Sequence, residues 1–323
     1  MTASRGSARG VTRQRTEADD PSGGGTGPAV GVILPSVATQ RDERLDLATA
    51  ARHAEEVGLD SVWHGDHLLG DEPTLDCTLA LAVAAAATRR VRIGTSVLVP
   101  ALRPLVWVAK QVATLQYLAQ GRLVVGVGSG VGPAQWAAAG VPYPHRGRRT
   151  DTALALLPGL LAGDTVRLAD EPGQPEVRLS PAVPRPPFWV GNASPVAIRR
   201  AARLGDGWFP SVLPVEEVAQ GAARLADLAA EAGRPVPTIA VGAAGALGYG
   251  SEARDRIAAE LTDAYGMPPE RAAGIPLVGG PEEVAERLQA YREAGAAHVV
   301  VGFSAAGWRR QCDLLAEARS LLR

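Results

Sequence analysis

The sequence predicts an α/β fold in which eight parallel strands, each followed by a helix, close into a (β/α)8 barrel, the TIM-barrel architecture. Short apolar runs alternate with helical stretches from Ala29 to the C-terminus, and the connections are long enough for parallel crossovers. The 323 residues include 46% hydrophobic side chains, which is enough to fill a large core. A doubly wound sheet shares this alternation, and periodicity alone does not separate the two topologies.

The first half of the chain contains four strands with their helices. The first strand is expected at Ala29–Leu34, before Pro35, and the helix that follows has an apolar face and stops at Gly58. The next elements are expected, in order, at Ser61–His64 (strand), Thr78–Ala87 (helix), Val91–Val97 (strand), 105–119 (helix) and Leu123–Gly126 (strand).

The second half supplies the other four strands. In order, we expect Phe188–Gly191 (strand), Ser194–Leu204 (helix), Trp208–Pro210 (strand), 215–232 (helix), Thr238–Gly242 (strand), His298–Gly302 (strand) and a closing helix to Leu321. Two insertions separate strand four from strand five. Residues 130–148 form a long Pro- and Gly-rich loop after strand four, where it borders the expected active face, and residues 165–187 form a Pro-rich excursion, with a small hairpin, before strand five.

Composition limits the function classes. Residues 1–28 are rich in Ser, Thr, Gly and Arg and are interpreted as a disordered extension, which leaves 29–323 as one barrel domain. The formal charge of −1 and the lack of a long basic run argue against nucleic-acid binding. No apolar run reaches membrane-spanning length. The two cysteines favour a reduced, cytoplasmic setting over a disulfide framework.

Four strand ends would meet around the barrel mouth, where active sites of this architecture form. Strand two ends in His64-Gly65-Asp66-His67, and two of these side chains are the catalytic candidates, Asp66 and His67. His67 has the residue type expected of a proton donor or acceptor near neutral pH. The alternative for Asp66 is a structural role, in which its side chain forms a hydrogen bond with the backbone amides of the turn. A metal site is not predicted, because the imidazoles lie on a strand end and turn with few further ligands.

Two other strand ends contain glycine. The run Gly126 to Gly132 does not have dinucleotide-binding spacing, so it permits either close approach of a flat ligand or a tight turn. Gly191-Asn192-Ala193-Ser194 precedes a helix that has Pro195 near its first position. This segment is either a helix cap formed by Ser194 or a seat for a phosphate at the helix N-terminus, and both alternatives stay open.

A series of short motifs, in order along the chain, resembles the bacterial luciferase-like superfamily of flavin- and F420-dependent oxidoreductases. The matching segments are 54–63, Asp66-His67, 94–97, Ala109-Lys110, 121–123, 126–130, 146–149 and 205–208. Members of this superfamily are βα barrels that bind FMN or the deazaflavin F420 at the carboxyl ends of the strands. The resemblance extends from Ala29 nearly to the C-terminus.

The resemblance implies a role for each candidate. Asp66 and His67 would lie at the redox ring of the cofactor. Ser96 and Val97 match the position of a non-prolyl cis peptide behind that ring. Gly128 and Gly130 would let the cofactor side chain pass close to the backbone. The phosphate would be held by Gly191, Asn192, Ala193 and Ser194.

Two departures qualify the resemblance. Many F420-dependent relatives have an acidic residue after the strand-four glycines, where this chain has Val131 to Trp136, so His67 is left as the main proton-transfer candidate. Asn192 stands where relatives usually have a second glycine, although Asn tolerates left-handed backbone.

The resemblance implies an F420-dependent oxidoreductase that transfers hydride to or from a small organic substrate. The alternative is an FMN-dependent monooxygenase that uses molecular oxygen and flavin reduced by a separate reductase. A non-catalytic cofactor-binding barrel is the third hypothesis. The resemblance also implies a homodimer.

Overall fold

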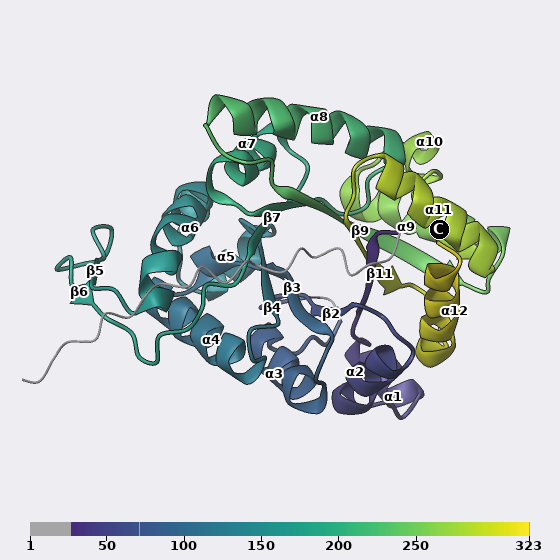
Figure 1. Cartoon of the computed structure of the whole chain (residues 1–323), viewed down its shortest axis with the longest axis horizontal. Coiled ribbons are helices and arrows are strands. Elements are labelled where there is room, and N and C mark those ends of the chain that lie inside the picture. Colours follow the sequence, from purple (N-terminus) through teal and green to yellow (C-terminus); the bar gives the residue numbers. More distant parts are fainter. Residues whose placement is uncertain (1–26, 71, 323) are drawn as a thin grey trace, which may run out of the picture.

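The computed structural model describes residues 27–70 and 72–322. Within them, nine strands form one sheet in the order β10-β9-β11-β1-β2-β3-β4-β7-β8, and β8 also pairs with β9. This closure leaves β10 outside a ring of eight parallel strands, with helices around it (Figure 1). The predicted (β/α)8 barrel is confirmed. The predicted N-terminal extension lies outside the described residues, apart from Gly27 and Pro28.

The strands of the barrel lie close to their predicted places. They are β1 (Ala29–Ile33), β2 (Ser61–His64), β3 (Arg92–Leu98), β4 (Leu123–Val127), β7 (Phe188–Gly191), β8 (Gly207–Phe209), β9 (Thr238–Leu247) and β11 (His298–Phe303). The prediction for strand seven was too short. It ended at Gly242, whereas β9 continues to Leu247 because its second half pairs with β10 (Leu277–Gly279) as well as with β11.

The outer layer consists of helices that follow the strands. The longer ones are α2 (Leu47–Glu56), α3 (Cys77–Ala87), α4 (Leu105–Leu118), α6 (Arg146–Ala162), α7 (Pro195–Leu204), α8 (Val215–Glu231), α9 (Ser251–Tyr265), α11 (Pro281–Glu293) and α12 (Trp308–Ser320). The short ones are α1 (Val37–Asp42), η1 (Pro100–Leu102), α5 (Pro133–Ala138), η2 (Tyr143–His145) and α10 (Pro269–Ala272).

Local sequence signals explain where several helices begin and end. The Asp46 side chain accepts a hydrogen bond from the Thr49 amide at the start of α2, and Gly58, at φ +89°, follows the end of that helix as predicted. Asp76 accepts from two backbone amides at the start of α3 in the same way. These side chains satisfy amides that have no partner inside the helix.

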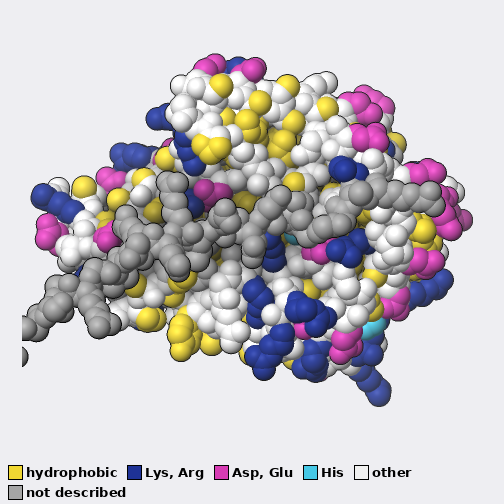
Figure 2. Space-filling view, viewed as in Figure 1, with side chains coloured by type: hydrophobic (Ala, Val, Ile, Leu, Met, Phe, Trp, Pro, Cys, Tyr) yellow, Lys and Arg dark blue, Asp and Glu magenta, His cyan; other side chains and the backbone are white. Residues whose placement is uncertain are grey.

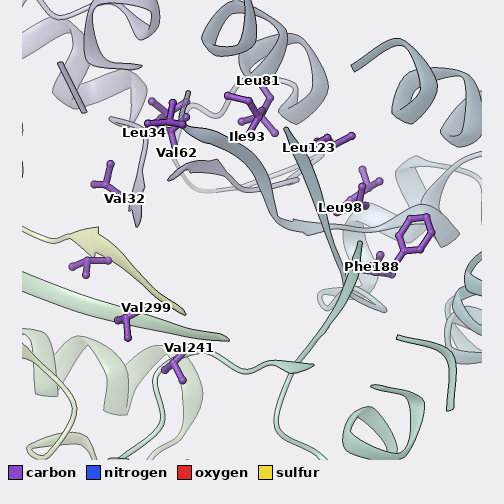
Figure 3. Close-up of a cluster of buried hydrophobic side chains, with 14 of the residues drawn as sticks. Val32, Leu34, Val62, Leu81, Ile93, Leu98, Leu123, Phe188, Val241 and Val299 are labelled. Atoms are coloured by element: carbon purple, nitrogen blue, oxygen red, sulfur yellow. The ribbon is translucent and has the colours of Figure 1, made fainter. Parts of the chain in front are cut away.

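The main hydrophobic core lies between the barrel and the helices. Val32, Val62 and Ile93 extend from successive strands and are fully buried with Leu81 of α3 (Figure 3). Alternation along each strand sends one set of side chains outward to this layer and the other set into the barrel. This layer therefore fixes the helices against the strands.

The inside of the barrel is filled by aromatic rings. Trp63 and Trp189 stack with centroids 5.4 Å apart, and Phe209 packs against both. A Cβ atom at Gly94 would lie 2.1 Å from the Trp63 ring, and one at Gly207 would lie 2.3 Å from the Trp189 ring. Glycine at these two positions is therefore required by the tryptophans, and the barrel below the mouth is a packed core.

The two predicted insertions carry structure of their own. Residues 166–167 and 176–177 form the small antiparallel hairpin β5–β6, which projects from the barrel at the left of Figure 1. The region 130–148 is not one continuous loop, because it contains α5 and η2 and α6 begins at Arg146. A third insertion, from α9 to β10, precedes the last crossover helix, α11, and was not predicted.

Surface charge is mixed. Figure 2 shows basic and acidic side chains interspersed over one face, with a group of basic side chains in the lower middle of the view. Among the described residues, no helix is both long enough and apolar enough to cross a membrane.

Candidate active site

A cleft of about 400 Å³ opens at the carboxyl ends of the barrel strands. The predicted site residues that line it lie at the ends of β2, β3, β4 and β7 or just after them, and they are Asp66, His67, Ser96, Val97, Gly128, Gly130, Gly191, Asn192 and Ala193. Of the predicted set, only Ser194 does not line it. The structure therefore brings together residues from four separate crossovers, as expected of a barrel mouth.

The Ser96–Val97 peptide bond is cis, which confirms the geometry implied by the family resemblance. The pairing of β3 with β4 shifts register between Thr95 and Leu98, so the chain bulges at this point. The Val97 side chain faces the carboxyl ends of β4 and β7. A Cβ atom at Gly128 would lie 2.5 Å from Val97 Cγ2, and one at Gly191 would lie 3.1 Å from Val97 Cγ1. Both glycines thus make room for Val97.

At position 130, glycine is required by the backbone conformation as well as by packing. Its φ is +68°, in the left-handed region, and a Cβ atom there would lie 2.9 Å from Val99 and 3.1 Å from the ring of Trp136. Packing within the chain is therefore sufficient to require glycine at 128 and 130. The glycine spacing that the sequence shows has a structural cause independent of any ligand.

Asp66 is buried and both of its carboxylate oxygens are occupied. Oδ2 accepts a hydrogen bond from the Val99 amide at 2.9 Å, and the Arg103 guanidinium donates to Oδ1 at 2.7 Å and to Oδ2 at 2.9 Å. The Arg103 side chain is itself 19% exposed. These contacts tie the end of β2 to the segment after the cis peptide, and they favour a positioning role for Asp66 over direct proton transfer. Arg103 was not identified from the sequence.

We expect Asp66→Asn to destabilise the fold by about 3 kcal/mol, because an amide cannot replace the carboxylate at the largely buried Arg103 and leaves that cation without its ion-pair partner. Urea denaturation of the variant measures the free energy of unfolding. Asp313→Asn, which weakens a half-exposed pair with His53, is the matched control and should cost less than about 1 kcal/mol. A wild-type midpoint for Asp66→Asn would contradict this account of Asp66.

His67 is exposed at the edge of the cleft, and its side chain makes no hydrogen bond to any residue in the described part of the chain. Its ring lies against Gly65, since a Cβ atom there would be 3.2 Å from Nε2. The nearby His64 differs: its Nδ1 lies 2.8 Å from the Gly65 carbonyl oxygen, and burial lowers its pKa. Of these two imidazoles, only His67 is in the cleft and free to contact a bound molecule. The described residues contain no cluster of three or more His, Cys, Asp or Glu side chains suited to a metal ion.

The loop after β7 combines a turn with a helix start. Asn192 has φ +79°, and its Oδ1 accepts from the Ser194 amide at 2.8 Å. Ser194 Oγ accepts from the Ala197 amide at 3.3 Å, so Ser194 caps α7. The amides of Ala193 and Val196 make no hydrogen bond to a described residue. The helix cap is therefore present, and two amides at the positive end of α7 stay available to an anion.

We expect Gly191→Val to weaken cofactor binding on the order of tenfold or more, because a branched side chain would crowd the loop that precedes α7. Fluorescence titration measures the affinity. The added side chain also approaches Val97. The double variant Gly191→Val with Val97→Ala removes that contact, and the loss should persist in it. Full recovery in the double variant would assign the effect to Val97 packing, and unchanged affinity in the folded single variant would leave the loop as a helix cap only.

The residues that form the opposite wall of the cleft were not predicted from the sequence. It is formed by Ser211–Leu213 after β8 and by Tyr265, Met267 and Arg271 from the insertion that contains α9 and α10. Arg271 Nε and Nη2 bind the two carboxylate oxygens of Glu217 on α8, at 2.5 and 2.8 Å. Neither the short helix α10 nor a lone Arg in a polar stretch gives a sequence signal that would have located this wall.

One motif of the resemblance has a structural role outside the cleft. The Arg122 guanidinium donates to the carbonyl oxygens of Ala85 at 3.0 Å, Thr88 at 3.2 Å and Val91 at 2.7 Å. It thereby satisfies carbonyls at the end of α3 and joins that helix to β4.

Comparison with known proteins gives consistent matches. The profile of the luciferase-like monooxygenase family matches residues 29–270. An F420-dependent glucose-6-phosphate dehydrogenase of Beutenbergia cavernae is 35% identical over 300 residues, which cover 79% of this chain and 86% of the relative. An uncharacterized protein of Mycobacterium tuberculosis is 34% identical over 168 residues, or 51% of this chain and 58% of the relative, so the chain spans little more than half of that relative's length.

Among solved structures, an F420-dependent secondary alcohol dehydrogenase in complex with an F420–acetone adduct superposes with a TM-score of 0.79 at 19% identity, over 92% of this chain and 99% of that one. At this identity the likeness shows the fold. The family profile, in contrast, covers most of the chain, including the strand ends that form the cleft. The chain belongs to the luciferase-like monooxygenase family.

Proposed function

We propose that this protein is an F420-dependent oxidoreductase that transfers a hydride between the deazaflavin and a small organic substrate. The observation that carries the proposal is the cleft itself, in which the proposed cofactor-binding residues surround the cis Ser96–Val97 peptide. The relative from Beutenbergia cavernae, which matches over most of its length, is named for the same cofactor.

The residues present fit such a cofactor. The bulge at Ser96–Val97 gives a backbone surface for a flat ring, and the available amides of Ala193 and Val196 suit a phosphate at the N-terminus of α7. Bound F420 would supply a ring carbon that accepts or donates the hydride. Asn192 adopts the left-handed backbone conformation that a glycine provides in relatives. The replacement of that glycine by Asn therefore keeps the turn that would hold the phosphate.

His67 and Asp66 would have different roles in the reaction. His67 would give a proton to the substrate oxygen, or take one from it, because it is the imidazole that lines the cleft and lacks a partner in the described chain. Asp66 would act indirectly. Through Arg103 and the Val99 amide it holds the segment that follows the cis peptide, and so it fixes the surface behind the ring.

An FMN-dependent monooxygenase is the second candidate, and the name of the family favours it. FMN and F420 share the ribityl and phosphate parts, so the loop before α7 suits both. The two candidates differ in the electron acceptor, which is molecular oxygen for the monooxygenase and the organic substrate or the deazaflavin for the oxidoreductase.

Turnover under two conditions tests the proposal. With oxidised F420 and a panel of small alcohols under argon, or with reduced F420 and the matching carbonyl compounds, we expect a change in F420 fluorescence that requires the protein. With chemically reduced FMN in air, we expect no oxygen consumption above that of free FMN. Oxygen consumption with FMN, together with no F420 reaction, would replace the proposal by the monooxygenase.

A further inference from the structure

The ionised side chains that line the cleft are already paired within the protein. Asp66 is matched by Arg103, which lies behind it, and Arg271 is matched by Glu217. In the described residues, Arg271 is the only Lys or Arg side chain that lines the cleft. Whether a ligand in this cleft meets the positive charge of Arg271 therefore depends on whether Glu217 stays paired with it.

That pair is bidentate, and its geometry commits two of the donor groups of Arg271. Nε and Nη2 each bind a different oxygen of Glu217, which is the planar arrangement that guanidinium and carboxylate prefer. The hydrogen bond from Arg271 lowers the pKa of the Glu217 carboxyl, so Glu217 is ionised at neutral pH and cancels the guanidinium charge. In this ion pair, Arg271 adds no net charge to the wall of the cleft.

The rest of the wall opposite the proposed cofactor seat is uncharged. Val212, Leu213 and Met267 present apolar surface, and Ser211 and Tyr265 supply the hydroxyl groups there. The single lysine of the chain, Lys110, lies elsewhere and donates to the Ser180 carbonyl oxygen at 2.6 Å. A dianion against this wall would lose hydration without gaining an uncompensated cation from it.

We infer that the substrate of this cleft is an uncharged, largely apolar molecule with one alcohol or carbonyl group, and that phosphate esters are excluded. This inference deepens the proposed function and rests on it. It separates the chain from the relative in Beutenbergia cavernae, whose name specifies glucose 6-phosphate. The feature that selects against the anion is Glu217, which lies on α8 beside the cleft and holds Arg271 in a neutral pair.

The test removes that carboxylate and measures binding of a named anion. Glucose 6-phosphate is titrated by calorimetry into F420-loaded protein, as wild type, as Glu217→Gln and as the double variant Glu217→Gln with Arg271→Gln. The wild type should bind it weakly. Glu217→Gln should bind on the order of tenfold more tightly, because the guanidinium charge is released, and the double variant should return to the wild-type affinity.

Glu260→Gln is the matched control. It removes the same charge from an exposed pair with Arg256 on α9, outside the cleft, so it should leave the affinity for glucose 6-phosphate unchanged. Wild-type binding as tight as that of Glu217→Gln would overturn the inference, as would the absence of any gain in Glu217→Gln. A gain that appears equally in Glu260→Gln would also overturn it, since the cause would be overall charge.

Failure of the proposed function gives a different result. F420 and FMN are titrated first, with each variant. If the chain binds FMN and not F420, the proposed function fails, and the anion titration is then run on FMN-loaded protein with the same decisive outcomes. If Glu217→Gln tightens cofactor binding and not glucose 6-phosphate binding, Arg271 faces the cofactor and the inference about the substrate is wrong.

Discussion

His67→Ala should lower turnover by about 10² to 10⁴, the range typical of a general acid–base group. The side chain lines the cleft, is exposed, and has no hydrogen-bond partner in the described residues, so its loss removes a proton-transfer group without removing a structural contact. Affinity for F420 should change much less, because the proposed seat of the cofactor lies on β3, β4 and the loop before α7. Single-turnover measurements separate the chemical step from binding.

The control for His67 is His53→Ala, which removes an imidazole from α2, where it pairs with Asp313 away from the cleft. That variant should keep wild-type turnover. A folded His67→Ala protein that binds F420 and turns over at the wild-type rate would show that His67 has no role in proton transfer.

The second large effect concerns acid stability and depends on His298, which is fully buried at the start of β11. Its Nε2 lies 2.7 Å from Ser61 Oγ, which also accepts a hydrogen bond from Trp63 Nε1. Burial, with a smaller contribution from the charge of Arg92, lowers the pKa of His298 from 6.5 to about 3. The folded state therefore keeps this imidazole neutral over a pH range in which the unfolded chain binds a proton.

The direction of the effect follows from linkage. Well above pH 6.5 the histidine is neutral in both states, and its contribution to stability is complete. As the pH falls from 6.5 to about 3, only the unfolded state takes up the proton, so the free energy of unfolding decreases by up to about 5 kcal/mol, at about 1.4 kcal/mol per pH unit. Near pH 4.5 the expected loss from this one group is about 2 to 3 kcal/mol.

Urea denaturation between pH 7 and pH 4.5 measures this loss. His298→Gln keeps a hydrogen-bonding group near Ser61 and cannot titrate, so the variant should lose about 2 to 3 kcal/mol less than the wild type over that range. His145→Gln, at an exposed position in η2, should follow the wild-type curve. Identical curves for His298→Gln and wild type would show that the buried imidazole is not the acid-sensitive group.

The elements of the fold that were predictable are those that depend on local patterns. Apolar periodicity located the barrel strands and most of the helices around them, and turn residues such as Gly58 marked helix ends. The second half of β9 was missed because a Gly- and Ala-rich segment has little strand propensity of its own. Its pairing with β10 and β11 is a tertiary effect that no local pattern records.

The site divides in the same way. The end of each strand could be predicted from the sequence, and the residues at the ends of β2, β3, β4 and β7 do share one cleft. The ion-pair partners could not be predicted, because Arg103 contacts Asp66, and Arg271 contacts Glu217, only after crossovers bring separate segments together. The glycines at 128 and 130 show a further limit, since they were interpreted as space for a ligand and the structure shows that packing also requires them.

Equilibrium binding tests most directly whether the cleft around Ser96–Val97 is a deazaflavin site, as we propose. Purified wild-type protein is titrated separately with F420 and with FMN, following the fluorescence of each cofactor, and Gly191→Val is titrated in parallel. We expect saturable binding of F420 that is tighter than binding of FMN and is weakened in Gly191→Val. Saturable binding of FMN with none of F420, or F420 binding that is equal in the two proteins, would contradict it.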